Sequence, residues 1–476
     1  MFRVKNIEDQ IASFSYELTY DNIPSAALKI AHLSILDIFG VTLAGSLRPE
    51  IQLLQKVIGQ WGGSSVCPVF GTNLCLPPSA AALLNGAASR VLDFDDVVDP
   101  LGIHPSVAIF PALSTIAALR QQHVTSSEFL TATVIGHDLI TRFARARKET
   151  LLESGRYDLS KVIAATAAAG RLYGLNPIQL RSAMGIAYTS ALGEAQCMVE
   201  GAPTVSYQQG LVASNAVKAV LLASEGFEGA HHFFTGRYGL FRTFESGSDV
   251  ESIVDGLGAV FASENDIAFK PYPTCRPNIS ATTLAISLAN YTQVRAEDIS
   301  HIDIAMNQQI YDLVCAPADK KWKPKTSVEA RFSMAYTVAV GLRNGGVFIA
   351  DYDDTALDRA DVLSISEKIR PRVDPKCEIP ELGTHGRIEV SIHYVSGDVR
   401  TGFIDIPKGN PQNPLEPTEI IEKFTNCCRY FDPRNGAIQA NNAIQAWERI
   451  MKDETGLQDF LAYGIAITSK SISSAK

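Results

Sequence analysis

The 476-residue sequence has few of the residues and motifs that mark a disulfide scaffold, a nucleotide site or a hydrolase triad. It contains eight cysteines and no CxxC pair, and only Cys427 and Cys428 are adjacent. Cysteines this sparse predict reduced thiols, so we expect a cytoplasmic protein. A Gly-rich phosphate loop, a GxSxG elbow and an HExxH helix are also missing, which leaves nucleotide chemistry and triad hydrolysis without support.

An excess of positive charge and a long uninterrupted apolar run are missing as well. The 42 Lys and Arg residues are outnumbered by 51 Asp and Glu residues, for a net charge of −9. Such a chain lacks the electrostatic footprint of a nucleic-acid or anionic-membrane binder, so an anion site has to be a local basic pocket. The most apolar N-terminal stretch contains Lys29, His32 and Asp37, which argues against a membrane span.

Helical periodicity dominates the first half of the chain. Apolar residues recur at helical spacing, and Thr125 with Glu128 predicts a capping box before a long helix. The Ala-rich segment 161–175 is apolar on nearly every side, which is typical of a helix inside a bundle. Together with segment 211–224 it carries more apolar surface than a small bundle usually buries, so we expect a homodimer.

The pattern changes near residue 269. Residues 301–306 predict a strand, 328–342 a helix, and the alternation on both sides of 396–398 a β-hairpin. A Pro/Asn-rich linker at 408–417 precedes two amphipathic helices. We therefore predict a mainly α protein, in which residues 1–267 and 412–465 form a discontinuous all-helical bundle domain. Residues 270–408 form an inserted, smaller α+β domain, and 466–476 a polar tail.

One acidic cluster stands out inside apolar sequence. Asp93, Asp95 and Asp96 follow an apolar helix, and His104 directly precedes another. Burying such groups is costly without partners, so they predict a site where His104 transfers protons and an acid orients it. If the helix continues, Asp93 and Asp96 share one face. The alternatives are a helix end exposed to water or a divalent-metal site; with a single His nearby, we expect no metal.

A second cluster of charge lies at the predicted domain junction. Lys270 and Arg276 flank a Pro-rich turn, and two cations there could clamp a substrate carboxylate. A structural turn with solvated charges is the alternative. His231 and His232 are adjacent, so one helix could not present both to a single metal ion.

Four segments together resemble the MmgE/PrpD family: LDFDD with HPS and PAL (92–113), the Ala-rich helix (164–175), KPYPTCR (270–276) and EARFSMAY (329–336). The resemblance spans almost the whole chain. It implies a discontinuous helical bundle with an α+β domain, usually in a homodimer. It also implies a site between the domains for substrates with several carboxylates, and no organic cofactor. Family members include 2-methylcitrate dehydratases, cis-aconitate decarboxylases and an iminodisuccinate epimerase.

The resemblance assigns roles residue by residue. Asp93, His104 and Lys270 match the family's catalytic positions, and Arg276 follows the lysine as it does in many members. A second family histidine is missing where this chain has Tyr157, and a bundle lysine is missing near Val205. Lys161 is a candidate for a displaced cation, and Tyr157 for a weak acid.

These matches and departures define the expected function. We expect a cofactor-independent lyase of a cis-aconitate- or alkylcitrate-type acid, with decarboxylation slightly favoured over dehydration. His104 is the expected proton-transfer group, oriented by Asp93, with Lys270 as the catalytic cation. Arg276, Asp96, Tyr272 and Tyr157 are the expected substrate-binding residues. The missing histidine and lysine leave two alternatives open: a polycarboxylate epimerase and a catalytically silent dimeric relative.

Overall fold

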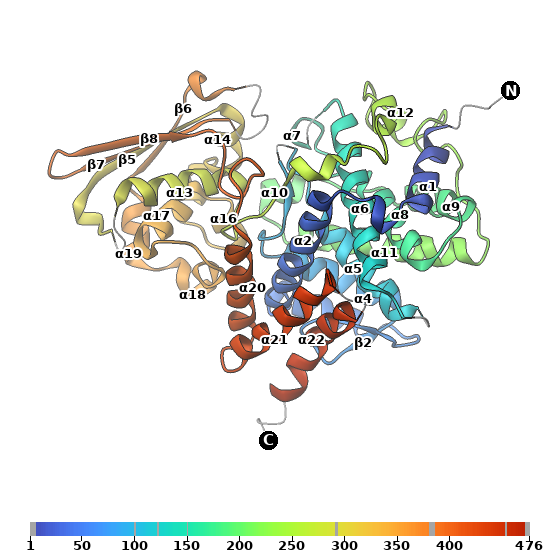
Figure 1. Ribbon diagram of the computed structural model, residues 1–476. Coiled ribbons are helices and arrows are strands. Elements are labelled where there is room, and N and C mark those ends of the chain that lie inside the picture. The colour runs from blue at the N-terminus through green and yellow to red at the C-terminus, as the bar shows by residue number, and fades with distance from the viewer. Residues whose placement is uncertain are drawn as a thin grey trace.

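The computed structural model describes residues 6–99, 101–120, 123–149, 151–290, 294–379, 386–452 and 455–471. The protein is mainly α-helical, as predicted. Figure 1 shows a helical part on one side and, on the other, a smaller part with a sheet, while the C-terminal helices lie below and between them. The predicted end of the polar tail, from residue 472, lies outside the described residues.

The helical part begins near the N-terminus and is built of helices joined by short loops. Its helices are α1 (Ile7–Glu17), α2 (Ser25–Gly45), α3 (Pro49–Ile58), α4 (Pro78–Arg90), α5 (Ser106–Leu119), α6 (Ser126–Ala146), α7 (Leu151–Ser154), α8 (Lys161–Tyr173), α9 (Pro177–Tyr188), α10 (Gln196–Glu200), α11 (Thr204–Ser224) and α12 (Leu240–Phe244). The predicted capping box of Thr125 and Glu128 is present at the start of α6. Two short antiparallel pairs interrupt the helices: β1 (Cys67–Pro68) with β2 (Cys75–Leu76), and β3 (Val97–Val98) with β4 (Ile267–Ala268).

The last three helices return to the helical part. They are α20 (Pro417–Phe431), α21 (Gly436–Ile450) and α22 (Gly456–Ser471), and α20 packs along α2. Lys423 of α20 forms a buried ion pair with Asp37 of α2 at 2.7 Å. His32 and Trp447 stack and exchange hydrogen bonds through their ring nitrogens and backbone carbonyls, each at 2.8 Å. The C-terminal segment is therefore fixed to α2 by charge as well as by apolar packing.

The smaller part combines one sheet with helices. Its elements are α13 (Arg276–Ala289), β5 (Ile299–Met306), α14 (Gln308–Val314), α15 (Ala318–Trp322), α16 (Ser327–Arg331), α17 (Met334–Asn344), α18 (Asp354–Leu357), α19 (Ala360–Ser366), β6 (Ile369–Val373), β7 (Ile388–Tyr394) and β8 (Val399–Ile404). The strand order is β6-β5-β7-β8, with β5 and β6 parallel and the other pairs antiparallel. Helix α13 packs against β7 and β8, and buried apolar residues of β5 and β7 belong to the core of this part.

Two local predictions have different outcomes here. The hairpin is confirmed, because β7 and β8 pair across a turn in which Gly397 has a φ of 91°. The single helix over 328–342 is wrong, because the helix ends at Arg331 and a second one begins at Met334. Thr326 caps α16 and the Ser333 side chain caps α17, so each short helix has its own N-terminal partner.

Two large apolar cores are present. The first joins buried residues between Ile7 and Phe269 with others between Leu415 and Phe460, and the second lies within the span from Cys275 to Ile392. The domain boundaries stay a prediction. The two cores are the structural observation that bears on these boundaries. The apolar surface of these two helices does not require a second copy of the chain, because a single chain already buries most of α8 and much of α11.

The helix α2 is long and apolar enough to cross a membrane, with a mean hydropathy of 1.6 in its most apolar window. Of that window, 78% is buried inside the protein. A core helix of a large domain meets the same criteria, and the place of α2 between α4, α6 and α20 accounts for its composition.

Candidate active site

The loop after α4 builds one wall of the site. Helix α4 lies very close to α11: a Cβ on Gly86 would lie 3.0 Å from the Gly210 Cα. The helix ends at Arg90, and Asp93 then adopts a left-handed conformation with a φ of 52°. An L residue rarely takes this conformation, though Asp tolerates it better than most. The expected continuation of the helix, which would have put Asp93 and Asp96 on one face, is therefore wrong.

Strand pairing brings Lys270 to this loop. β3 follows the acidic cluster and pairs with β4, which directly precedes the KPYP turn. Lys270 is almost fully buried, and its Nζ lies 2.9 Å from Asp93 Oδ1 and 3.1 Å from the Asp93 carbonyl oxygen. An ammonium has three N–H groups, so one donor remains for a ligand.

Arg90 ties two carboxylates of the cluster together. Its Nη1 donates to Asp93 Oδ1 and to Asp95 Oδ1, the latter at 3.3 Å. Burial by itself would raise the pKa of Asp93, but Lys270 and Arg90 outweigh it and hold that pKa well below its usual range. Burial opposes charge in the same way at Asp95, where His104 and Arg90 lower the pKa to about 2. Both carboxylates are therefore ionised at neutral pH.

His104 is oriented by Asp95, not by Asp93 as expected. Its Nδ1 lies 2.7 Å from Asp95 Oδ2 and 3.0 Å from the carbonyl oxygen of Asp96. These acceptors hold the proton on Nδ1, and Nε2 has no hydrogen-bond partner among the residues that the structure describes. Burial, followed by the charge of Arg90, lowers the pKa of His104 to about 4 despite Asp95. With a pKa this low, the imidazole is neutral at pH 7.

A cavity of about 90 Å³ joins the loop to the smaller part of the molecule. Asp93, His104, Lys270, Arg90, Tyr157 and Arg276 line it, together with apolar side chains. The three residues predicted to be catalytic, Asp93, His104 and Lys270, therefore meet in one place.

Most of the hydrogen-bond donors of Arg276 bind other groups of the protein. Its Nε and Nη2 bind both oxygens of Asp99, and its Nη1 donates to the Lys408 carbonyl at 2.7 Å. Asn410 adds a hydrogen bond to the same carboxylate at 3.2 Å. The two unused N–H groups of the guanidinium are the only ones left for a ligand. Arg276 thus positions the loop as well as lining the cavity.

The segment 155–161 contributes one residue, Tyr157, to the lining of the cavity. Asp158 is also left-handed, with a φ of 48°, and pairs with Lys161 at 3.1 Å. Lys161 also donates to Gln209 at 3.0 Å and is fully buried, so the expected displaced cation does not line the cavity. Tyr157 does line it, and burial raises the pKa of its hydroxyl to about 12, which makes it a poor acid.

Two expected substrate-binding residues lie elsewhere. Asp96 is fully buried behind the loop, where its carboxylate accepts hydrogen bonds from the Ser106 backbone N–H and hydroxyl; Ser106 Oγ also lies 3.0 Å from His137 Nε2. Burial raises the pKa of Asp96 to about 7 and lowers that of His137 to about 3. Tyr272 lines a different groove, beside Phe348 and α20. The left-handed turn at Asp93 and the rigid KPYP turn direct these side chains away from the cavity.

Sequence reasoning missed Arg90 and Asp95. Arg90 is the last residue of an apolar helix, and a single cation at such a position is itself a signal of a buried partner. Asp95 was noted only as a member of the acidic cluster. Together the residues place a neutral imidazole with one free nitrogen beside buried cations, which can stabilise negative charge. Asp93 and Asp95 already have cationic partners, which a metal ion would have to displace.

Residues from both the helical part and the α+β part line this cavity. The MmgE/PrpD N-terminal domain matches residues 9–253, and the MmgE/PrpD C-terminal domain matches residues 272–449. The chain belongs to the MmgE/PrpD family.

Curated relatives cover most of the chain. It is 28% identical over 445 residues to the cis-aconitate decarboxylase-like protein oryM of Aspergillus oryzae, covering 88% of this chain and 90% of the relative. It is 23% identical to the human cis-aconitate decarboxylase, covering 88% and 87%, and 25% identical to the 2-methylcitrate dehydratase of Salmonella typhimurium, covering 88% and 90%. These relatives are named as lyases.

Proposed function

We propose that the protein is a lyase acting on a small polycarboxylic acid of the cis-aconitate or alkylcitrate type. The observation that carries this proposal is the convergence of His104, Asp93 and Lys270 on one cavity between the two parts. The cavity's size suits a small molecule rather than a polymer. The names of the protein's relatives, cis-aconitate decarboxylase and 2-methylcitrate dehydratase, supply the substrate class.

Decarboxylation is the reaction we favour. The bond to one carboxylate breaks, carbon dioxide leaves, and the electron pair spreads through the allylic system toward a neighbouring carboxylate. Lys270 and Arg90 are buried cations at the cavity and would lower the energy of that charge. His104 Nε2 would then deliver a proton to carbon. Because His104 is neutral in the free protein, this proton has to be taken up with the substrate, whose negative charges raise the imidazole pKa.

Dehydration is the second candidate, and the low pKa of His104 favours it. A neutral imidazole is ready to remove an α-proton without prior protonation. The electron pair then expels a hydroxide, which leaves as water after a proton transfer. Tyr157, with a pKa of about 12, is a weak donor for this step, so Lys270 would be the acid.

A catalytically silent relative is the alternative of another class. It predicts that the departures at Tyr157 and Val205 have removed the chemistry. The retained site argues against this, since a fold without catalysis has no need to keep three ionisable groups buried around one cavity. We also propose a homodimer, on the resemblance alone; sedimentation showing only a monomer of 51.5 kDa would refute that part.

The test is incubation of purified protein with citrate, 2-methylcitrate, cis-aconitate and their alkylated analogues in deuterated water. Decarboxylation gives a product one carbon shorter that carries one deuterium from solvent, whereas dehydration gives a new alkene at constant carbon number. NMR distinguishes both from plain proton exchange, which an epimerase would show. A folded protein that changes none of these acids would contradict the proposal, and the His104→Gln variant is the matched control for background conversion.

A further inference from the structure

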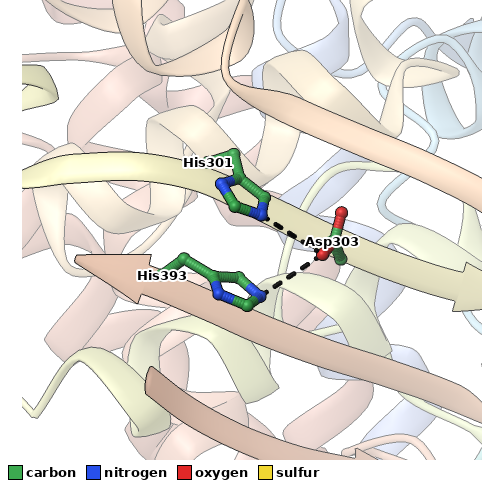
Figure 2. A group of neighbouring side chains, drawn as sticks. All are labelled: His301, Asp303 and His393. Carbon is green, nitrogen blue, oxygen red and sulfur yellow. Dashed lines mark ion pairs between the residues drawn. The ribbon is translucent and has the colours of Figure 1, made fainter. Parts of the chain in front are cut away.

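The outer face of the sheet carries a cluster that no step of the proposed reaction uses. His301 and Asp303 lie on β5, and His393 lies directly across from His301 on the antiparallel neighbour β7. Side chains two apart on a strand, and those directly opposite on the next strand, share one face. Figure 2 shows the two imidazoles side by side, with the carboxylate of Asp303 at their ends.

The three side chains aim their donor atoms at a common point. His301 Nε2 lies 3.5 Å from Asp303 Oδ2, and His393 Nε2 lies 3.3 Å from the same oxygen. All three candidate ligand atoms lie within 4.8 Å of one another. In a tetrahedral zinc site with bonds of about 2.0–2.1 Å, neighbouring ligand atoms are roughly 3.3–3.4 Å apart. The two nitrogen–oxygen separations therefore match edges of such a site.

The surroundings of the cluster fix its rings. The imidazoles stack with centroids 4.1 Å apart and an angle of 10° between their planes. His301 Nδ1 lies 3.2 Å from the Ser300 hydroxyl, which can accept the Nδ1 proton and leave Nε2 as the ligand atom. A partner of this kind on the other ring nitrogen is the usual support of a metal-bound histidine. All three side chains are partly exposed, so an ion has access.

We propose that His301, Asp303 and His393 form a binding site for a divalent transition-metal ion of the zinc class. Two imidazoles and one carboxylate suit zinc and its neighbours better than calcium or magnesium, which prefer oxygen ligands. Three protein ligands leave a fourth position for water. The ion would join β5 to β7 near the start of β5, whereas the cavity lies beyond the end of that strand, where Ile310 of α14 lines it.

One neighbouring charge opposes the ion and makes the proposal sharper. Arg370 on β6 pairs in register with Asp303 and lies on the same face. Its positive charge acts on His301 and weakens the attraction for a cation. Removing it should therefore tighten binding, which a purely structural histidine pair would not predict.

The test titrates the full-length, metal-free protein with Zn²⁺ by calorimetry and with Co²⁺ by visible absorption. We expect one equivalent to bind, and Co²⁺ to show the absorption bands of tetrahedral nitrogen–oxygen coordination. His301→Ala and His393→Ala should weaken binding by more than ~100-fold, which exceeds the usual effect of an outer partner, and Ser300→Ala by about 10-fold. Arg370→Gln should strengthen it, and His231→Ala, at an exposed histidine elsewhere, should leave it unchanged.

Several outcomes would overturn the site. Absence of stoichiometric binding to the wild-type protein would leave the cluster as a stacked cross-strand pair with an ion pair to Asp303. Binding that survives His301→Ala and His393→Ala, or that is lost in His104→Gln instead, would place the ion elsewhere. Circular dichroism of each variant separates lost ligands from lost folding, and Asp303→Asn is a second ligand variant that keeps the size of the side chain.

Discussion

Two buried Asp–Lys pairs flank the cavity, and they are built differently. In both, the aspartate is left-handed: φ is 52° at Asp93 and 48° at Asp158. Asp93 pairs with Lys270, 177 positions along the chain and beyond the junction with the smaller part. Asp158 pairs with Lys161 only three positions on, at the start of α8.

The difference separates chemistry from local structure. The pairing of β3 with β4 brings Asp93 and Lys270 together, and both residues line the cavity. The Asp158–Lys161 pair closes within one turn and points its ammonium at Gln209, outside the lining. Removing the first pair should therefore affect turnover most, and removing the second should affect stability most.

The largest expected effect is on turnover. It is tested with one variant near the Asp93–Lys270 pair and one variant next to the Asp158–Lys161 pair. His104→Gln should lower kcat by about 10²–10⁴-fold, the usual range for the loss of one general acid or base. Tyr157→Phe, on the Asp158 side, should change it less than about tenfold, because a hydroxyl with a pKa of about 12 contributes little as an acid. Steady-state kinetics on the substrate found by NMR measure both. Equal losses in the two variants would erase the distinction between the sides.

The next effect compares the two lysines directly. Lys270→Met should lower kcat by roughly 10²–10³-fold, because it removes a buried cation from the charge that develops in the transition state. In the correctly folded fraction of the Lys161→Met variant, kcat should stay within about tenfold of the wild-type value. A Lys161→Met variant that folds normally and loses as much activity as Lys270→Met would assign Lys161 to the chemistry.

Lys161→Met should affect the stability of the protein more than its turnover. Lys161→Met leaves Asp158 buried without its cation, which typically lowers the free energy of unfolding by about 3–5 kcal/mol. The double variant with Asp158→Asn should recover part of that loss, since it removes the orphaned charge and Asn tolerates the left-handed backbone. Denaturant unfolding measures all three proteins; a double variant less stable than Lys161→Met would contradict the explanation.

The pH dependence of stability tests the Asp93 side further. His104 has a folded pKa of about 4 against 6.5 when unfolded, so the unfolded state binds more protons in this window and stability falls as pH drops from 6.5 to 4. Asp96, raised to about 7, works in the opposite direction: its contribution is largest below 3.8 and is lost as pH rises through 7. Asp96→Asn should therefore steepen the acid destabilisation, by up to about 1.4 kcal/mol per pH unit. Unfolding curves at several pH values would show an unchanged slope if Asp96 is ionised in the native protein.

The smallest effect concerns the support behind the loop. Ser106→Ala removes the hydroxyl that donates to Asp96 and lies beside His137, so both lose a buried partner. We expect the free energy of unfolding to fall by about 1–3 kcal/mol, with kcat lowered less than in His104→Gln. A kcat loss as large as that of His104→Gln, with stability unchanged, would instead place Ser106 in the reaction.

Local signals in the sequence were enough for many elements and for three residues that line the cavity. The capping box at Thr125 and the hairpin around Gly397 depend on neighbours in the chain, and both were predicted from spacing. Asp93, His104 and Lys270 were found because their motifs are local too. The predicted helix over 328–342 failed because Ser333 starts a second helix, a choice that the apolar spacing alone does not reveal.

The orientation of the carboxylates could not be predicted. A single left-handed residue, Asp93, decides that Asp95 reaches His104 while Asp96 turns to Ser106. A prediction from residue spacing assumes a regular backbone, so it cannot include a left-handed turn at a single residue. The metal-site cluster was missed for a related reason, since His301 and His393 meet only through the register of β5 and β7.

The two crossings between the helical part and the smaller part lie side by side. The Phe269 N–H donates to the Gly409 carbonyl at 3.0 Å, and a Cβ on Gly409 would lie 1.8 Å from the Phe269 carbonyl oxygen, so only glycine fits there. For protein engineering, residues 270–408 are therefore a cassette whose two ends touch. In a deletion variant that joins residue 269 directly to residue 409, the new link has to span only the width of one hydrogen bond. A foreign domain with adjacent termini could be inserted at the same place. Expression of such a deletion, followed by thermal unfolding, would show whether the helical part keeps its cooperative transition without the cassette.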